Sequence, residues 1–389
     1  MVEFLACADF SRDNLGTAAH PIARPPKRVH AFHVPFRLHP PLTTTRAMAL
    51  MTSRHPWTLA GLVVSLALPG LLAAGAPDPD KVTGPEACAE CHIQELEAWK
   101  LTVHFKTLSE LHRRPETAAM LGKLGLGRIK AERQCVECHY LEKKVDTEVQ
   151  VAAGITCESC HGAAKDWAQT HGDYGKGNTK ATEAPAHRDA RLAQARTAGM
   201  LYPANLYAIG ANCYACHVVA DEKLTNIGGH VPASEGFTFL TWSQGEVRHT
   251  ILHTGNKANP EATPEHKRRL FVLGGILETE FCFRAVAHAT EKAAFGVTLA
   301  RRADAARKLL EKIQAAAPTP ELAAVIAVAK PAGLRLNNAA ELTAAADKIA
   351  GLGREFAAKV TGEQLAAIDP LLPGPDQYKG KVYQVAGAP

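Results

Sequence analysis

The chain repeats one short motif four times within 130 residues, and this repeat limits the folds that are open to it. Each copy has two cysteines separated by two residues, followed at once by a histidine. The copies CAECH, CVECH, CESCH and CYACH hold Cys88, Cys91 and His92; Cys135, Cys138 and His139; Cys157, Cys160 and His161; and Cys213, Cys216 and His217. With 10 cysteines and 18 histidines in 389 residues, chance would place only ~0.01 such motifs.

The spacing of the motif suits the covalent attachment of haem. Residues at i, i+3 and i+4 share one helical face, so two thiols can add to the two vinyl groups while the histidine meets the iron. This is the attachment signal of c-type haem. Zinc knuckles have no reason to place a histidine after every second cysteine. A redox dithiol would occur once, near a βαβ pattern that the sequence lacks. We therefore expect four covalently bound haems c.

The N-terminal part of the sequence predicts export. Residues 58–76 form an apolar run that follows Arg54 and ends in an A-x-A arrangement at Ala74 and Ala76. We expect residues 51–76 to be a signal peptide cleaved near Ala76, which places the protein in the periplasm. An uncleaved membrane anchor is the alternative, since the run approaches the ~18 residues of a marginal spanning helix. Residues 1–50 are expected to be a mis-assigned start or a disordered leader.

The positive charge of the chain belongs largely to this leader. Residues 1–76 contain 7 of the 44 Lys and Arg residues but only 3 of the 39 Asp and Glu residues, which leaves 37 against 36. Nothing in this balance predicts nucleic-acid binding. Haem propionates would make the surface locally acidic, so we expect periplasmic or membrane-bound redox partners that dock through basic residues.

The remaining chain divides by composition. We expect residues 77–258 to form a tetrahaem cytochrome c domain whose porphyrins replace most of an apolar core, and residues 259–389 to form a C-terminal helical region. The fold class is therefore mainly α, a multihaem cytochrome c fold with little regular strand and a haem-filled core, plus a C-terminal helical bundle. That bundle would cover haem edges or form a homo-oligomer contact. It contains no catalytic constellation.

Local patterns predict individual elements. Helices are expected over 86–112, 117–140, 186–200, 270–287 and 291–316, the last with a break at Gly296, and strands over 148–155 and 235–242. Three further helix starts are marked by Thr319 before Pro320, by Asn338 with Glu341, and by Thr361 with Gln364 in a capping-box arrangement.

A second histidine on each iron would have to come from outside the motifs. If the helix that carries His92 continues to His104, the two lie about 18 Å apart along its axis, so His104 serves another haem or none. His171 follows His161 by ten residues across Gly162, which favours a neighbouring haem. His112, His187, His266 and His288 are better explained as surface or core residues.

Two later segments offer further ligands. His249 and His253 are spaced i, i+4 on one helical face, so one would bind iron and the other would be an outer partner. His230 lies on the glycine turn IGGHVP, where it would reach an iron or line an open site. Arg248, beside His249, is placed to pair with a haem propionate.

The order of these motifs resembles the tetrahaem cytochrome c-554 family. The resemblance covers roughly residues 84–255 and depends on CAECH, the W-x4-H spacing of Trp99 and His104, CVECH, GITCESCHG with a histidine shortly after it, and CYACH. It implies that His104 ligates the fourth haem, His171 the first, and a histidine at 249–253 the third. In that family the second haem, here on Cys135, Cys138 and His139, is five-coordinate. The chain departs from the family in His230 and in its C-terminal helices.

Two functions are compatible with these features. The first is a periplasmic electron-transfer protein that relays single electrons between redox partners along four haems. The alternative is a redox enzyme that acts on a small nitrogen oxide or hydroxylamine at a five-coordinate second haem. All four motifs end in histidine. An enzyme resembling the pentahaem nitrite reductases would have a C-x-x-C-K motif, and one resembling hydroxylamine oxidoreductase would have additional haems and a cross-linking tyrosine. We therefore favour the electron carrier over the enzyme, by analogy with the family.

Overall fold

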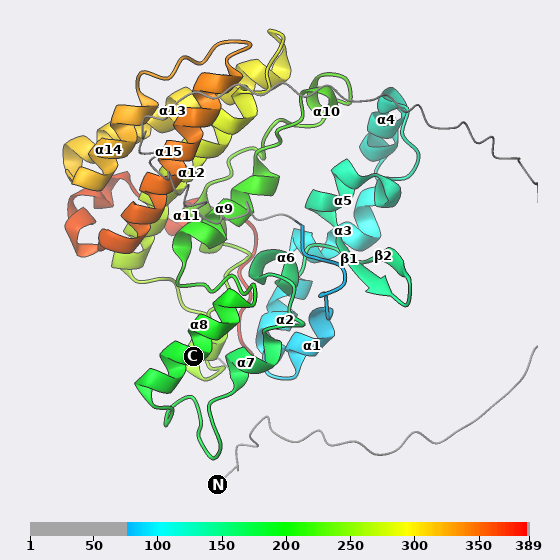
Figure 1. Ribbon diagram of the computed structural model, residues 1–389, viewed down its shortest axis with the longest axis vertical. Coiled ribbons are helices and arrows are strands. Elements are labelled where there is room, and N and C mark those ends of the chain that lie inside the picture. The colour runs from blue at the N-terminus through cyan, green and yellow to red at the C-terminus, as the bar shows by residue number, and fades with distance from the viewer. Residues whose placement is uncertain (1–75, 387–389) are drawn as a thin grey trace, which may run out of the picture. The chain divides into compact units, whose positions relative to one another are not determined.

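The computed structural model describes residues 76–386 (Figure 1). The mainly α class predicted from the sequence is confirmed: helices dominate and the strands are confined to one small sheet. The predicted leader over 1–50 and nearly all of the predicted signal peptide over 51–76 lie outside the described residues. No helix within residues 76–386 is long and apolar enough to cross a membrane.

Short elements carry the motifs and their connections. They are α1 (Pro85–Ala89), α2 (Ile93–Lys100), α3 (Val103–Glu110), η1 (Leu111–Arg113), α4 (Pro115–Leu124), η2 (Ile129–Ala131), α5 (Arg133–His139), β1 (Leu141–Val145), β2 (Glu148–Ala153), α6 (Cys157–His161), α7 (Ala168–Gly172), α8 (Pro185–Thr197), α9 (Leu206–His217), α10 (Glu222–Asn226), α11 (Phe239–Ser243) and η3 (Ile251–Thr254).

Three of these elements differ from the sequence-based expectation. The expected helix over 117–140 is divided into α4, η2 and α5. The expected helix over 86–112 is three helices, because the chain turns at Cys91–His92 and again before Val103. The predicted strand over 235–242 is wrong. The Thr238 hydroxyl accepts a hydrogen bond from the Thr241 N–H at 3.2 Å and so caps α11. The strand expected over 148–155 is present as β2, paired antiparallel with β1.

Longer helices follow in the C-terminal part. They are α12 (Pro264–Val286), α13 (Ala294–Ala316), α14 (Pro320–Ala329) and α15 (Ala339–Lys359), followed by the 3₁₀ turns η4 (Glu363–Leu371) and η5 (Pro375–Gln377). The predicted break at Gly296 is wrong, since the chain leaves the helix at Ala287 and Gly296 lies within α13. Thr319 caps α14 as expected, because its hydroxyl accepts from the Leu322 N–H at 3.2 Å.

One large apolar core joins the fourth motif to the C-terminal helices. In Figure 1, α12, α13, α14 and α15 lie together and α9 runs beside them. Tyr207 and Tyr214 of α9 are buried in the same cluster as Leu277 of α12 and Phe356 of α15. The helix that bears Cys213, Cys216 and His217 therefore uses the C-terminal helices as its packing surface.

The last described residues return to the first motif. The Tyr383 hydroxyl donates to Gln94 Oε1 on α2 at 2.8 Å, and Val385 packs against Ala98 and Ile251. Further back, the Lys379 carbonyl accepts from the Glu246 N–H at 2.8 Å. The C-terminal segment thus ties the region around His249 to the helix that follows His92.

We predict that Gly210→Ala lowers the free energy of unfolding by about 1–3 kcal/mol, the usual effect of overpacking a core. A Cβ at Gly210, on α9, would clash with Leu277 Cδ1 and lie 3.0 Å from Phe239 Cε1. Denaturant unfolding of the haem-loaded protein, followed by circular dichroism, measures the change.

The matched control is Gly122→Ala on α4, where a Cβ would meet nothing within 4 Å. This substitution should raise stability by about 0.5–1 kcal/mol, because alanine is the better helix former. Equal stabilities of the two variants would show that α9 and α12 are not closely packed in solution.

Candidate haem sites

Each motif histidine faces a second histidine from elsewhere in the chain. The ring centroids are 6.2 Å apart for His92 and His171, and 6.1 Å apart for His104 and His217, for His139 and His230, and for His161 and His249. A metal-bound imidazole nitrogen lies about 2.0–2.1 Å from a metal such as zinc, so two rings on opposite sides of one ion have centroids about 6 Å apart. The spacing in all four pairs fits one metal ion between the rings.

The surroundings keep the buried imidazoles neutral. Burial, together with the charges of neighbouring histidines, lowers the pKa of His139 and His161 to about 4 and that of His217 to about 3. Burial also lowers the pKa of His104. A neutral imidazole is the form that binds a metal, so no proton has to be displaced near pH 7. Among residues 76–386 no group of three or more His, Cys, Asp or Glu side chains is arranged to hold a metal ion directly.

The position of His104 is set by a tight turn between α2 and α3. The Trp99 indole N–H donates to the Ile155 carbonyl at 2.6 Å, and the Thr102 hydroxyl donates to the Trp99 carbonyl at 2.7 Å. Gly154 lies so close to α3 that a Cβ there would be 2.5 Å from the His104 carbonyl oxygen. The W-x4-H spacing and the glycine before Cys157 therefore serve one purpose, which is to direct α3 toward His217.

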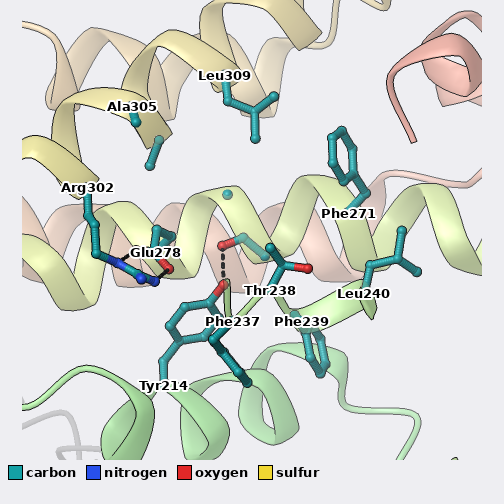
Figure 2. A pocket seen from close by; sticks show the side chains of 13 residues that line it. Tyr214, Phe237, Thr238, Phe239, Leu240, Phe271, Glu278, Arg302, Ala305 and Leu309 are labelled. Atoms are coloured by element: carbon teal, nitrogen blue, oxygen red, sulfur yellow. Dashed lines mark hydrogen bonds and ion pairs between the residues drawn. The ribbon is translucent and has the colours of Figure 1, made fainter. Parts of the chain in front are cut away.

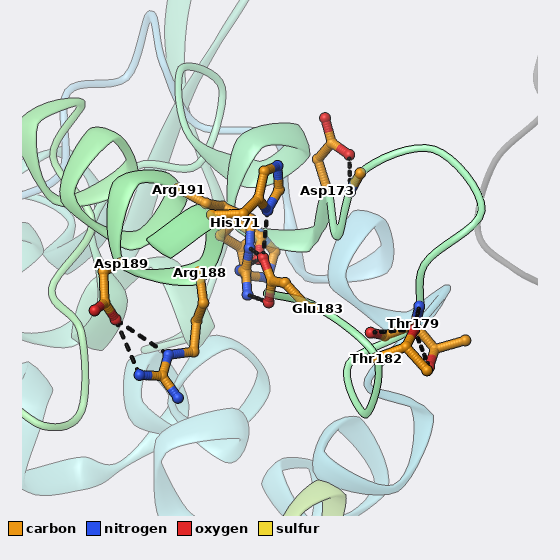
Figure 3. A network of polar contacts seen from close by, with 10 residues as sticks. His171, Asp173, Thr179, Thr182, Glu183, Arg188, Asp189 and Arg191 are labelled. Carbon is orange, nitrogen blue, oxygen red and sulfur yellow. Dashed lines mark hydrogen bonds and ion pairs between the residues drawn. The ribbon is translucent and has the colours of Figure 1, made fainter. Parts of the chain in front are cut away.

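The backbone of His171 is held by Arg191 of the neighbouring helix, which is paired with Glu183 just before that helix (Figure 3). Arg191 of α8 donates to the carbonyl of His171 and forms two bonds with Glu183, at 2.7 and 2.6 Å. The hydrogen bond to Arg191 lowers the pKa of Glu183 to about 2, so the pair stays ionised at neutral pH. The side chains of Arg191 and Glu183 are 8% and 2% exposed, so this pair is shielded from solvent.

The motifs touch one another in an order that differs from their order in the chain. The Cys88 thiol hydrogen-bonds Cys157, and this contact is the largest of the causes that raise the pKa of Cys88. Cys138 and Cys216 make the same kind of contact. Between these two pairs, the Asn212 amide donates to the Ser159 carbonyl at 2.7 Å. The spatial order is therefore first, third, fourth and second motif.

Several buried polar atoms lack a hydrogen-bond partner among the described residues. They include Arg248 Nε and Nη1, Tyr140 Oη, Trp167 Nε1, Trp242 Nε1 and Glu95 Oε2. Buried polar groups almost always have partners, so these atoms indicate a polar group that the protein chain does not supply. Arg248, next to His249, is the clearest case. Its one ionic contact, Glu261, is 3.9 Å from Nη1, and burial lowers its pKa. The N–H and O–H donors among these atoms fit a haem with carboxylate side groups.

A cavity lined in part by the C-terminal helices does not belong to these sites (Figure 2). It has a volume of about 270 Å³ and lies between α9, α12 and α13. Its lining is mostly apolar, with the Glu278–Arg302 ion pair at one side, and the Tyr214 hydroxyl donates to the Gly274 carbonyl at 3.0 Å. None of the motif cysteines or paired histidines lines it.

The sequence left one choice open and missed several contacts. Of His249 and His253, the structure places His249 against His161, while His253 is exposed and no partner ring is found for it among the described residues. The contacts of His217 with Ser234, whose hydroxyl lies 2.8 Å from Nδ1, and with Phe237, which stacks at 4.1 Å, carried no sequence signal. Ser234 and Phe237 have no defined spacing in the sequence from a C-x-x-C-H motif, so no pattern predicts these contacts.

The motifs and the paired imidazoles together define a class, the c-type cytochromes. Residues 87–162 match the family described as cytochrome c554 and c-prime. Cytochrome c-554 of Nitrosomonas europaea is 27% identical over 126 residues, which cover 30% of this chain and 52% of that protein. The chain thus spans about half the length of the curated relative it matches. No solved structure matches the chain. The comparisons support a haem-containing cytochrome of the c554-like type, with covalently bound c-type haem.

We predict that Arg191→Met weakens the hold on His171 and gives a high-spin haem signal. Methionine fills the space but leaves Glu183 buried without its cation and the His171 carbonyl without its donor. Electron paramagnetic resonance of the oxidised protein measures the signal.

Arg188→Met is the matched control on the same helix. The Arg188 side chain is 55% exposed and pairs only with the adjacent Asp189 at 3.0 Å. An unchanged low-spin spectrum in both variants would show that the Arg191 contact does not position His171.

Proposed function

We propose that this protein is a periplasmic electron carrier with four covalently bound haems, each held between two histidines, that relays single electrons between redox partners. One observation carries the proposal. Four histidine pairs, drawn from eight separate places in the sequence, all have the ring spacing that suits one iron. A single pair with this spacing could arise by chance. Four such pairs, each with one motif histidine, support the binding of one iron by each pair.

The ligand set follows from these pairs. His92 and His171 would hold the first haem, His139 and His230 the second, His161 and His249 the third, and His217 and His104 the fourth, each haem attached through the cysteines of its motif. The buried guanidinium of Arg248 would pair with a propionate beside His249. His253, which we considered as a ligand, would stay outside the iron sites.

Contacts between motifs support a continuous path. Haem iron, when bound, supplies reversible one-electron chemistry without making or breaking bonds in a substrate. The protein keeps neighbouring attachment sites close through Cys88 and Cys157, through Asn212 and Ser159, and through Cys138 and Cys216. Electrons would therefore pass in the order first, third, fourth and second haem, or the reverse.

The alternative, a redox enzyme with an open second haem, requires that His139 has no partner across the iron. The His230 ring lies 6.1 Å from the His139 ring, where it would occupy the sixth position. The Nδ1 atom of His230 is 2.7 Å from the Val231 carbonyl, which orients the ring. These contacts favour the carrier over the enzyme.

The location and partners remain parts of the proposal. Export through the signal peptide expected over residues 51–76 would bring the chain to the compartment where c-type haem is used, and docking partners would present basic residues to propionate-rich edges. A homo-oligomer contact through the C-terminal helices is a further proposal.

We predict that His230→Ala converts one haem in four from low spin to high spin, because it removes the sixth ligand from the second haem. Haem number, checked by mass, should remain four. The measurement is electron paramagnetic resonance of the oxidised protein, with nitric oxide added to detect the newly opened iron.

His253→Ala is the control, since this histidine is exposed and has no ring partner among the described residues. It should leave all four haems low spin. A high-spin haem already present in the unmodified protein would contradict the proposed ligation and would favour the enzyme instead.

A further inference from the structure

The four histidine pairs are not electrostatically alike. In five of the eight histidines the Nδ1 atom lies near a neutral oxygen: the backbone carbonyls of Ala168, Leu201, Val231 and Val247, and the hydroxyl of Ser234. His92 differs from them. Its Nδ1 is 3.9 Å from Glu95 Oε2, and it is the one paired histidine among residues 76–386 with a carboxylate oxygen within 4.0 Å.

Glu95 is built into this position. The side chain lies in the first turn of α2 and is 12% exposed. Its Oε1 accepts a hydrogen bond from the Leu252 N–H at 2.7 Å, which ties α2 to η3, while Oε2 is buried and has no hydrogen-bond partner among the described residues. A carboxylate that only served the helix N-terminus would turn to the N–H groups of α2. This one is held by a different segment and leaves a free oxygen toward His92.

We infer that Glu95 is a positioning residue whose carboxylate faces the Nδ1–H of His92 and makes the haem attached at Cys88 and Cys91 the one with the lowest reduction potential. The inference rests on the proposed ligation of that haem by His92 and His171. A carboxylate partner makes the imidazole a more basic ligand, and its negative charge favours the more positive, oxidised iron. The neutral oxygens near the other histidines carry no full negative charge, so they lower the reduction potential of the iron less.

Nearby cations do not cancel this charge. Arg191, which donates to the His171 carbonyl, is already bound by both oxygens of Glu183. Within residues 76–386, no lysine or arginine lies within 4.0 Å of a Glu95 oxygen. Lys180 lowers the pKa of His92, but by less than Glu95 raises it. Glu95 is therefore the charged group with the largest effect on His92.

The place of the first haem in the spatial order determines how its low potential would affect electron flow. The first motif contacts the third and lies at one end of the spatial order, so the low-potential haem would be terminal. At equilibrium, electrons would collect away from His92, and this end would suit entry from a strongly reducing donor.

The ring geometry provides a signal for this haem alone. The His92 and His171 planes are 16° apart, whereas the other pairs are at 60°, 53° and 83°. Nearly parallel imidazole planes give an ordinary rhombic low-spin spectrum, and strongly crossed planes give a signal with a single large g value. A redox titration followed by electron paramagnetic resonance can therefore follow the first haem separately.

In the haem-loaded protein the rhombic signal should be the last to disappear on reduction. Glu95→Gln should make it disappear earlier, with the reduction equilibrium of that haem favoured about tenfold, or 59 mV for one electron. Glu97→Gln is the matched control on α2. Glu97 is 47% exposed, pairs with Lys100 at 2.8 Å, and should cause no shift.

The inference is overturned if the rhombic signal is reduced with or before the others in the unmodified protein, a test that needs no variant to fold. It is also overturned if Glu95→Gln and Glu97→Gln shift the midpoint equally. Failure of the proposed function looks different: fewer than four haems by mass, or a high-spin signal before any reductant is added.

Discussion

The spacing of two opposed imidazole rings, which suits one iron atom between them, is the constraint on which the motif region depends. Four pairs must reach the same spacing at once, and long helices could not deliver both members of each pair. The region instead uses short helices, of which α8 with 13 residues is the longest, joined by turns fixed through single contacts. Trp99 with Ile155 and Gly154 against α3 place the His104 ring, and Arg191 holds the backbone of His171.

The parts of this arrangement that the sequence predicts are those with a fixed local spacing. The four motifs, the helical class and the cap at Thr319 follow from residues within one helical turn. The capping box expected at Thr361 is present only as the bond from its N–H to Gln364, before a 3₁₀ helix. A length argument and the family resemblance send His104 and His171 to distant haems, and the structure places them beside His217 and His92. His249 and His253 share a helical spacing, so periodicity has no means of choosing between them. The choice depends on η3, which turns His253 outward.

The contacts that the sequence could not predict lie between segments far apart in the chain. The stretch around Phe239 has a strand composition but forms a helix, because Thr238 caps it and because Phe239 and Leu240 are buried beside α12. Burial against other parts of the fold therefore sets the secondary structure of this stretch, as it often does for short aromatic segments. The same is true of the C-terminal helices, whose composition suggested a separate bundle although α9 is buried in their core. Cofactor attachment at the fourth motif and packing of the C-terminal region are therefore linked.

Glu158 and Glu95 are two carboxylates in or near the motifs whose hydrogen bonds give them different roles. Glu158, inside the third motif, receives the N–H groups of Thr83 and Ala164 on Oε1, at 2.9 and 2.8 Å, and that of Gly84 on Oε2 at 2.7 Å. Both oxygens are satisfied by backbone, so Glu158 is a structural clamp that brings the first motif to the third. Glu95 has one oxygen engaged and one free. Because a buried free acceptor is unfavourable without a donor, the bound state of His92 is the one that completes it. The same side chain type thus fixes the fold in one place and acts on the ligand in the other.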